Sequence, residues 1–348
     1  MTVIFRRTKS KGPDSELTCS ACRNSFDISN SPPLNFTRCP HCGEMTFVPR
    51  WIDQYRIFAP IGAGGMAAVY RAEDTESGEE VAVKILNPVE HPSEADQTEF
   101  VHEAAVGELF DHPHLVKVYT HGVDSGTPYM VMELVEGQRL DQRMEAVGKM
   151  SEAMTLEIAY QSALGLQEMH RQGMVHADIK PKNILISDDG VVKVFDFGLA
   201  RSISRNGAPD GDMPEEIVGT PWYLPPERIE HQPEDERSDQ YSLGATMFHM
   251  LAGRPPIEEG TAGEVALKQA RQPLLTIKAY VKGISQPTGD LVTRMLKKEP
   301  GKRFASDAEL IAALKAAREH VGQSVDLSRS QRRAPSKKRR GWMRGWRK

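Results

Sequence analysis

The chain has 348 residues and a formal net charge of −4, a length that corresponds to about two domains. Hydrophobic residues make up 39% and charged residues 26%, which is typical of a soluble globular protein. No apolar run approaches the roughly 18 residues of a membrane-spanning helix, and residues 1–12 lack the apolar core of a secretory signal. These features argue against a secreted disulfide scaffold, a collagen-like fibre and a single-pass membrane protein, and they predict a cytoplasmic location.

Charge and cysteine are distributed unevenly along the chain. Residues 1–50 hold seven Lys/Arg and four Asp/Glu, residues 328–348 hold ten Lys/Arg and no acid, and the remainder carries a net charge of −17. All four cysteines lie within the first 42 residues. Because such asymmetry marks segments with different roles, we expect a head at 1–50, a body at 51–321 and a tail at 322–348.

The head contains two C-x2-C pairs, Cys19/Cys22 and Cys39/Cys42, with 16 residues between them. This spacing is typical of a tetrahedral four-thiolate zinc site. Reduced thiols and disulfides are the alternatives, and a cytoplasmic location disfavours disulfides. His41 is an alternative ligand to one of the cysteines, although an exposed position fits it better. The head therefore resembles a zinc ribbon with structural Zn²⁺, and three phenylalanines are expected to form a small shell around it: Phe26, Phe36 and Phe47.

The sequence pattern at the start of the body predicts strands around a phosphate-binding loop. Residues 55–70 read as two apolar runs separated by a glycine-rich turn, and a third run at 81–86 contains Lys84. Glycine lets the backbone approach a ligand and present N–H groups to phosphate. Each feature alone is weak evidence, because most glycine-rich turns bind nothing and most strand lysines are simply solvated. Together, about 20 residues apart on neighbouring strands, they favour a nucleotide site.

Two later segments supply the polar groups of phosphoryl transfer. Residues 174–186 place Asp178, Lys180 and Asn183 in one loop between apolar runs, and residues 192–198 end a strand on Asp196. Asn and Asp oxygens suit Mg²⁺. Asp178 can accept the proton of an attacking hydroxyl, while Lys180 offsets charge on the group transferred.

The body resembles a protein kinase domain from about Tyr55 to about Val321. The motifs occur in the order of that family: the glycine loop, V-A-V-K, H-x-D-x-K-P-x-N, D-F-G, and the block G-T-P-W-Y-L-P-P-E at 219–227. Asp239 and Arg303 are further landmarks. The resemblance implies that Asp239 braces the catalytic loop and that Arg303 pairs with Glu227. It also implies an α+β fold with a β-rich small lobe and a helical large lobe, and ATP with Mg²⁺ or Mn²⁺ in the cleft between them.

The resemblance assigns catalytic roles position by position. Lys84 would hold the α- and β-phosphates and pair with Glu103, Asp178 would be the catalytic base, and Lys180 would approach the γ-phosphate. Asn183 and Asp196 would be the Mg²⁺ ligands. His176 is expected to be a packing residue, and a 3-4-3-4 spacing marks the buried face of the preceding helix at Leu156, Ala159, Ala163, Leu166 and His170.

The nucleotide-binding residues also follow from the resemblance. Glycines would cover the phosphates, Glu133 and Val135 would give backbone hydrogen bonds to adenine, and Met132 would gate the pocket behind it. The full set is Gly62, Ala63, Gly64, Gly65, Val69, Ala82, Lys84, Met132, Glu133, Val135, Leu185, Asn183 and Asp196.

The catalytic loop with Lys180, which Thr220 would support, resembles that of the serine/threonine branch of the family. The compact glycine loop resembles that of its bacterial members. The chain departs from the pattern at Ala67, where a third glycine is usual, and at Ala177, where an Arg that pairs with a phosphorylated activation loop is usual. We therefore expect a non-specific serine/threonine protein kinase that acts on protein Ser/Thr hydroxyls without activation-loop phosphorylation. The alternative is an ATP-binding pseudokinase that recruits partners through its head and tail; the retention of Lys84, Asp178 and Asp196 disfavours it.

Within the tail, residues 328–348 hold ten cations and no acid, and such a segment does not fold alone. After Arg340, the apolar residues Trp342, Met343 and Trp346 are interleaved with cations. The tail suits peripheral attachment to an anionic membrane, nucleic-acid binding, or docking on the acidic body. A solvated tail without a function is the fourth alternative. The substrate, the activating signal and the oligomeric state leave no pattern in the sequence.

Overall fold

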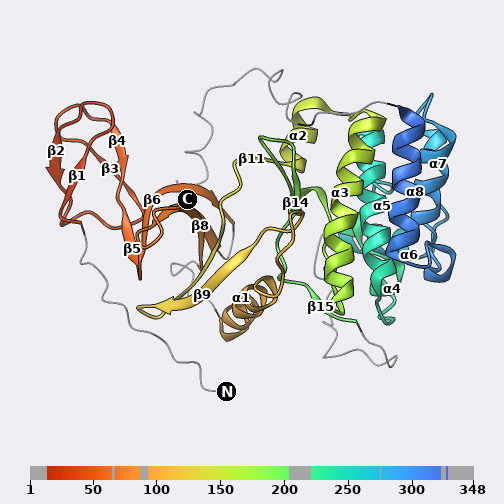
Figure 1. Cartoon of the computed structure of the whole chain (residues 1–348), viewed down its shortest axis with the longest axis horizontal. Helices are drawn as coiled ribbons and strands as arrows, with labels where there is room; N and C mark the ends of the chain where they lie inside the picture. Colours follow the sequence, from red (N-terminus) through yellow and green to blue (C-terminus); the bar gives the residue numbers. More distant parts are fainter. Residues whose placement is uncertain are drawn as a thin grey trace. The chain divides into compact units, whose positions relative to one another are not determined.

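The computed structural model describes residues 14–64, 67–86, 93–203, 221–274, 276–322 and 327. They form two compact units: the first holds the residues up to Glu108 and Lys117–Leu134, and the second holds Leu109–Val116 and the residues from Val135 onward. Figure 1 colours both along the chain. Gly65, Thr220, most of the segment after Asp196 and the basic tail lie outside the described residues.

The first unit begins with two small β-hairpins. Each hairpin is an antiparallel pair of three-residue strands, β1 (Glu16–Thr18) with β2 (Ser25–Asp27) and β3 (Phe36–Arg38) with β4 (Met45–Phe47). Each turn carries one C-x2-C pair. The two turns have the same pattern of backbone hydrogen bonds. In the first, Cys19 N–H donates to Asn24 O and Arg23 N–H donates to Cys19 O. In the second, Cys39 N–H donates to Glu44 O and Gly43 N–H donates to Cys39 O.

A six-stranded antiparallel sheet follows, with strand order β5-β6-β7-β8-β10-β9. Helix α1 (Glu94–Gly107) contacts β9 and β10, and it begins at Ser93, whose side chain forms a reciprocal capping box with Asp96. The strands are β5 (Arg50–Ile52), β6 (Tyr55–Ala63), β7 (Ala67–Asp74), β8 (Glu80–Leu86), β9 (Val118–Asp124) and β10 (Thr127–Glu133).

One residue of the hairpins, Phe47, belongs to the core of the sheet. Phe47 of β4 is buried with Ile52, Ile57 and Tyr70 of the sheet, and its ring lies 6.2 Å from that of Tyr70. The predicted phenylalanine shell is therefore only partly right, since Phe26 packs beside Cys19 and Cys39 whereas Phe47 belongs to the sheet's core. The boundary predicted between residues 50 and 51 falls inside β5, which pairs with β6.

The second unit is mostly helical. Figure 1 shows α3, α5, α7 and α8 side by side, and these helices contact one another. The helices are α2 (Leu140–Val147), α3 (Glu152–Arg171), α4 (Pro226–Ile229), α5 (Glu236–Ala252), α6 (Ala262–Arg271), α7 (Gln286–Met295) and α8 (Asp307–Val321), with short 3-10 turns η2 (Pro181–Asn183), η3 (Pro221–Tyr223), η4 (Ile277–Ala279) and η5 (Pro300–Lys302). The strands are β11 (Gly137–Arg139), β12 (Met174–Val175), β13 (Ile184–Ser187), β14 (Val192–Val194) and β15 (Arg201–Ser202).

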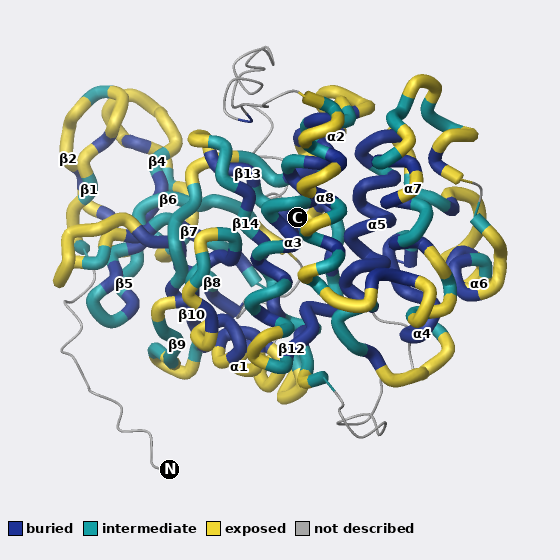
Figure 2. Tube along the Cα trace, turned by 45° about the vertical axis from the view of Figure 1, so that its right-hand side comes forward, coloured by how far each residue is buried: buried dark blue, intermediate teal, exposed yellow. Residues whose placement is uncertain are grey.

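Helix α5 forms the centre of this unit and is buried along nearly its whole length, as Figure 2 shows. Arg303, among the largest fully buried side chains, forms an ion pair of 2.6 Å with Glu227. The predicted Arg303–Glu227 pairing is therefore confirmed. The pair joins α4 to the residue that follows η5, and Arg303 also donates to the backbone carbonyl of Arg237 on α5.

Candidate active site

In the first unit, Lys84 and Glu103 form the ion pair that the sequence predicts. Lys84 extends from β8, and its Nζ lies 2.7 Å and 2.5 Å from the two carboxylate oxygens of Glu103 on α1. Glu103 is buried and the Lys84 side chain is 19% exposed. Two hydrogen bonds to one carboxylate fix the position of the Lys84 ammonium. The third N–H of an ammonium group can then donate to another acceptor.

Strand register places the other predicted residues of this unit near Lys84. Val69 of β7 and Met130 of β10 pair with Lys84 from either side, and Gly62 of β6 pairs with Val69. Ala82 pairs with Met132. Because side chains two residues apart share a face of a strand, Val69, Ala82, Lys84 and Met132 lie on one face of the sheet.

The glycine loop is not explained by the protein's own packing. Gly64 N–H donates to Ala67 O at 2.8 Å and closes the turn. A Cβ added to Gly62 would meet no atom within 4 Å, and Gly62 has no positive φ. The open space fits a loop whose backbone must approach a ligand.

The residues predicted at the adenine site fall in both units. Met132 and Glu133 end β10, Val135 follows in the second unit, and Leu185 lies on β13 there. Glu133 N–H donates to Lys117 O at 2.9 Å. The N–H of Glu133 is therefore already used within the protein.

In the second unit, Asp178 is held by its neighbours in the loop. Its Oδ2 accepts from Lys180 Nζ at 2.7 Å and from Asn183 Nδ2 at 2.8 Å, and Asn183 Nδ2 also donates to the backbone carbonyl of Asp178. The side chains of Asp178 and Lys180 are 11% and 15% exposed. Such contacts hold a carboxylate in one rotamer, as a positioned proton acceptor requires.

A network of Asp239, His170 and Asp307 supports the backbone of the catalytic loop directly before Asp178. Asp239 of α5 accepts the backbone N–H groups of His176 and Ala177 at 2.7 Å and 2.8 Å, as predicted for a brace of the loop. Its Oδ2 also meets His170 Nε2 at 2.9 Å, while His170 Nδ1 meets Asp307 Oδ2 at 2.9 Å. Burial lowers the pKa of His170, but the two carboxylates outweigh burial and raise it to about 10.

His176 is fully buried and packs against Phe197, with 5.8 Å between ring centroids. Its Nε2 lies 3.2 Å from Phe195 O and its Nδ1 accepts from Asp178 N–H. The ring therefore connects the loop of Asp178 to the backbone between the end of β14 and Asp196, which confirms its role in packing. The strand ends at Val194, two residues before the predicted end at Asp196.

Asn183 and Asp196 offer a donor set suited to Mg²⁺. Asn183 gives its amide nitrogen to Asp178, so its amide oxygen is the atom left for a ligand. Asp196 has a φ of 72°, an unusual conformation for a non-glycine residue that is common at functional sites. Within the described ranges its carboxylate makes no hydrogen bond or ion pair. Hard oxygen donors of this kind fit Mg²⁺.

The comparisons with known proteins agree with this geometry. The model of the protein kinase domain matches residues 55–315. The chain belongs to the protein kinase family. Its fold is that of the family, with a small lobe that is a curled sheet (the first unit, from β6 onward) and a helical large lobe (the second unit), preceded by a Cys cluster that fits a zinc ribbon.

Bacterial kinases are among its relatives. It is 34% identical to the serine/threonine-protein kinase PknA of Corynebacterium glutamicum over 76% of this chain and 56% of the relative. It is 34% identical to PknB of Mycobacterium leprae over 80% of this chain and 45% of the relative. It is also 32% identical to a probable serine/threonine-protein kinase of Clostridium acetobutylicum, over 75% of this chain and 39% of the relative. The chain thus spans about half the length of these curated relatives.

The four cysteines come together at the two hairpin turns. Their sulfurs all lie within 4.8 Å of one another, with 3.6 Å between Cys19 and Cys42 and 3.7 Å between Cys22 and Cys39. A disulfide bond requires an S–S distance of about 2.05 Å, so these pairs are not disulfides. Zn–S bonds of about 2.3 Å put tetrahedral sulfurs about 3.8 Å apart. The cluster therefore fits a metal ion of the size and softness of Zn²⁺.

The electrostatics of the cluster also fit a cation. The backbone N–H of Cys22 is the main cause that lowers the pKa of Cys19 to about 6. For Cys42, the N–H of Glu44 lowers the pKa, but desolvation and the other three cysteines raise it to about 12. Four thiolates repel one another unless a cation neutralises them, and His41 is not part of the cluster.

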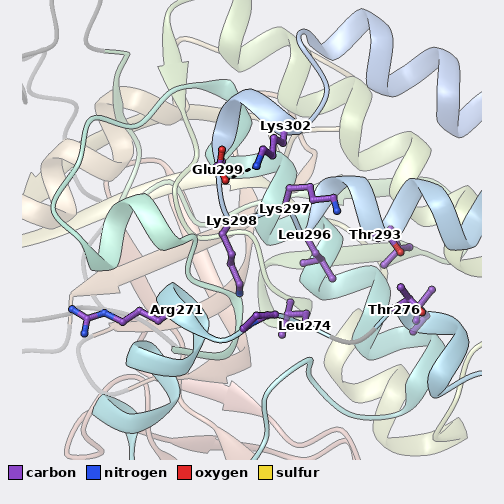
Figure 3. A pocket seen from close by; sticks show the side chains of 12 residues that line it. Arg271, Leu274, Thr276, Thr293, Leu296, Lys297, Lys298, Glu299 and Lys302 are labelled. Atoms are coloured by element: carbon purple, nitrogen blue, oxygen red, sulfur yellow. Dashed lines mark hydrogen bonds and ion pairs between the residues drawn. The ribbon is translucent and has the colours of Figure 1, made fainter.

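A hollow of about 270 Å³ in the large lobe lies away from all these residues, between α6, η4, α7 and η5. Figure 3 shows that its cations do not converge, because Arg271 and Lys297 point apart and Lys302 lies against Glu299. Lys298 Nζ is occupied by Tyr241 Oη and Gln269 O. The hollow thus lacks a set of donors directed at one ligand.

Sequence reasoning missed two parts of the large lobe's support. One is the contact of His170 with Asp307, and the other is a cluster of Arg201, Arg228 and Glu234. Neither has a spacing that a sequence pattern detects. Among the residues that the structure describes, no helix has both the length and the apolarity needed to cross a membrane.

Proposed function

We propose that the chain is a serine/threonine protein kinase that transfers the γ-phosphoryl group of Mg-ATP to protein Ser or Thr hydroxyls. The observation that carries the proposal is the arrangement of Asp178, whose carboxylate is fixed by Lys180 and Asn183. The names of the bacterial relatives support the substrate class.

Each group has one task in the proposed reaction. Lys84, fixed by Glu103, binds the α- and β-phosphates, and the backbone of the glycine loop covers them. Asp178 orients the substrate hydroxyl and accepts its proton, while Lys180 offsets charge on the phosphoryl group as it moves. Asn183 and Asp196 hold Mg²⁺, which when bound neutralises phosphate charge. No covalent intermediate with the protein is needed, because positioning and charge stabilisation carry the reaction.

Phosphoamino-acid analysis tests the substrate class. The full chain, incubated with radiolabelled ATP, Mg²⁺ and a generic basic protein, should yield phosphoserine or phosphothreonine and no phosphotyrosine. ATP binding without transfer would favour the pseudokinase alternative. Loss of both binding and transfer would refute the nucleotide site.

We further propose that the four cysteines hold structural Zn²⁺ that stabilises the small lobe. The support is the core that Phe47 shares with the sheet and the pairing of β5 with β6; binding energy of a structural zinc contributes directly to folding. The shared core favours a role in stabilising the small lobe over one in recruiting substrate.

Elemental analysis and thermal unfolding test the zinc proposal. We expect one Zn²⁺ per chain, its loss in Cys42→Ser, and its retention in the matched variant His41→Ser. A strong chelator should lower the unfolding temperature of the wild type. Zinc-free protein with unchanged unfolding would contradict a structural role.

A further inference from the structure

A cluster of three charged side chains, two of them buried, lies in the large lobe beside the catalytic loop. Glu234, whose side chain is 3% exposed, accepts two hydrogen bonds from Arg228 of α4, Nε to Oε1 at 2.9 Å and Nη2 to Oε2 at 3.0 Å. Arg201 of β15 approaches the same Oε1 with its Nη2 at 2.8 Å. One carboxylate therefore joins two guanidinium groups, in the geometry that makes such pairs strong and directional.

The cluster reaches the catalytic loop through Arg228. Its Nη1 donates to the backbone carbonyl of Ala177, directly before Asp178. The N–H of Ala177 donates to Asp239 on the other side. Ala177 has a φ of 67°, a conformation that a non-glycine residue keeps only when its surroundings hold it. Arg228 and Asp239 are the groups that hold it here.

The cluster reaches a second functional segment through Arg201. Arg201 lies five positions after Asp196, and β15 pairs with β12, the strand that leads into the catalytic loop. Glu234 therefore links the segment that leaves Asp196 to the backbone beside Asp178.

Glu234 also supplies the charge that lets the two arginines lie together. Burial and the charge of Arg228 both lower the pKa of Arg201, while Glu234 and, more weakly, Asp239 oppose them. Without this carboxylate, the buried guanidinium of Arg228 and the partly buried one of Arg201 would repel each other, and the loop would lose its contact at Ala177.

We propose that Glu234 is a positioning residue whose carboxylate holds the catalytic loop and the segment after Asp196 in their working arrangement, through Arg228 and Arg201. This inference rests on the proposed kinase activity and names its regulation. The carboxylate is part of the chain, so the arrangement does not depend on phosphorylation of Ser202 or of Ser204, which lies outside the described residues.

Steady-state kinetics of the full chain test the proposal with two variants and one control. Glu234→Gln keeps the size and removes the charge. The double variant Arg228→Met/Glu234→Met replaces the pair with apolar side chains of similar length, a change that buried pairs often tolerate without unfolding. The control is Glu157→Gln, which breaks the ion pair of Glu157 with Arg318, between α3 and α8 and away from the loop.

We expect kcat to fall about tenfold to a hundredfold in both Glu234 variants, the usual cost of a misplaced catalytic group, while KM for ATP and nucleotide binding change little. The control should keep its kcat. Wild-type protein treated with a phosphatase, and the Ser202→Ala/Ser204→Ala variant, should also keep theirs.

Two results would overturn the inference: an unchanged kcat in the folded double variant, or loss of activity after phosphatase treatment that returns with phosphorylation of Ser202 or Ser204. A wild type that transfers no phosphate at all would instead refute the proposed kinase function, so the two failures are distinguishable.

Discussion

The ion network of His170 makes the stability of the large lobe depend on pH in a defined direction. His170 lies between Asp239 and Asp307, which raise its pKa from 6.5 to about 10 although burial opposes them. A folded-state pKa above the unfolded value stabilises the protein fully below pH 6.5, and this contribution is lost as pH rises through about 10. We predict that it weakens steadily from pH 6.5 upward.

The magnitude follows from proton linkage. Between the unfolded and folded pKa values, the unfolded state releases the proton and the folded state keeps it, so stability falls by about 1.4 kcal/mol per pH unit. From pH 6.5 to 8 the loss is about 2 kcal/mol. This figure depends only on a folded pKa well above 8.

Urea unfolding of the wild type and of His170→Gln at pH 6.5, 7.2 and 8.0 measures the effect. The variant leaves the buried Asp239 and the partly buried Asp307 without their cation, so it should be less stable at every pH. The difference in unfolding free energy should shrink by about 2 kcal/mol from pH 6.5 to 8, while other titrating groups affect both proteins alike. A difference that does not change with pH would refute the charged His170.

Three further predictions concern stability. Arg303→Met, which leaves Glu227 buried without its partner, should lower the unfolding free energy by about 3–5 kcal/mol, measured in urea; a change below 1 kcal/mol would contradict the structural role of the pair. Burial lowers the pKa of Lys298 to about 8 from 10.5, so the wild type should gain stability relative to Lys298→Met between pH 8 and 10.5, and an opposite slope in thermal unfolding would count against this. Ile57→Ala, in the core of the small lobe, should cost about 2–5 kcal/mol by the same urea assay; a loss under 1 kcal/mol would place Ile57 outside a close-packed core.

The sequence predicted contacts well where a motif fixes both partners. The pairings of Lys84 with Glu103 and of Arg303 with Glu227, and the contact of Asp239 with the catalytic loop, are all present. Each of these residues lies in a segment whose pattern identifies it. The four cysteines likewise meet because doubled C-x2-C spacing allows few other arrangements.

Contacts without a motif escaped prediction. Arg228 meets a backbone carbonyl 51 positions away, and no periodicity links the two. Phe47 was expected beside the cysteines, yet the pairing of β5 with β6 brings it into the core of the sheet. Such contacts depend on how elements pack, and local propensity does not encode packing.

The proposed phosphoryl transfer is tested most directly by Asp178→Asn. This variant keeps the size of the side chain and removes the proton acceptor, and Asp188→Asn, in an exposed turn after β13, is its matched control. Transfer of labelled γ-phosphate to a basic protein should fall by about a hundredfold or more in Asp178→Asn and stay unchanged in Asp188→Asn, with ATP still bound in both. Transfer by Asp178→Asn at the wild-type rate would contradict the account.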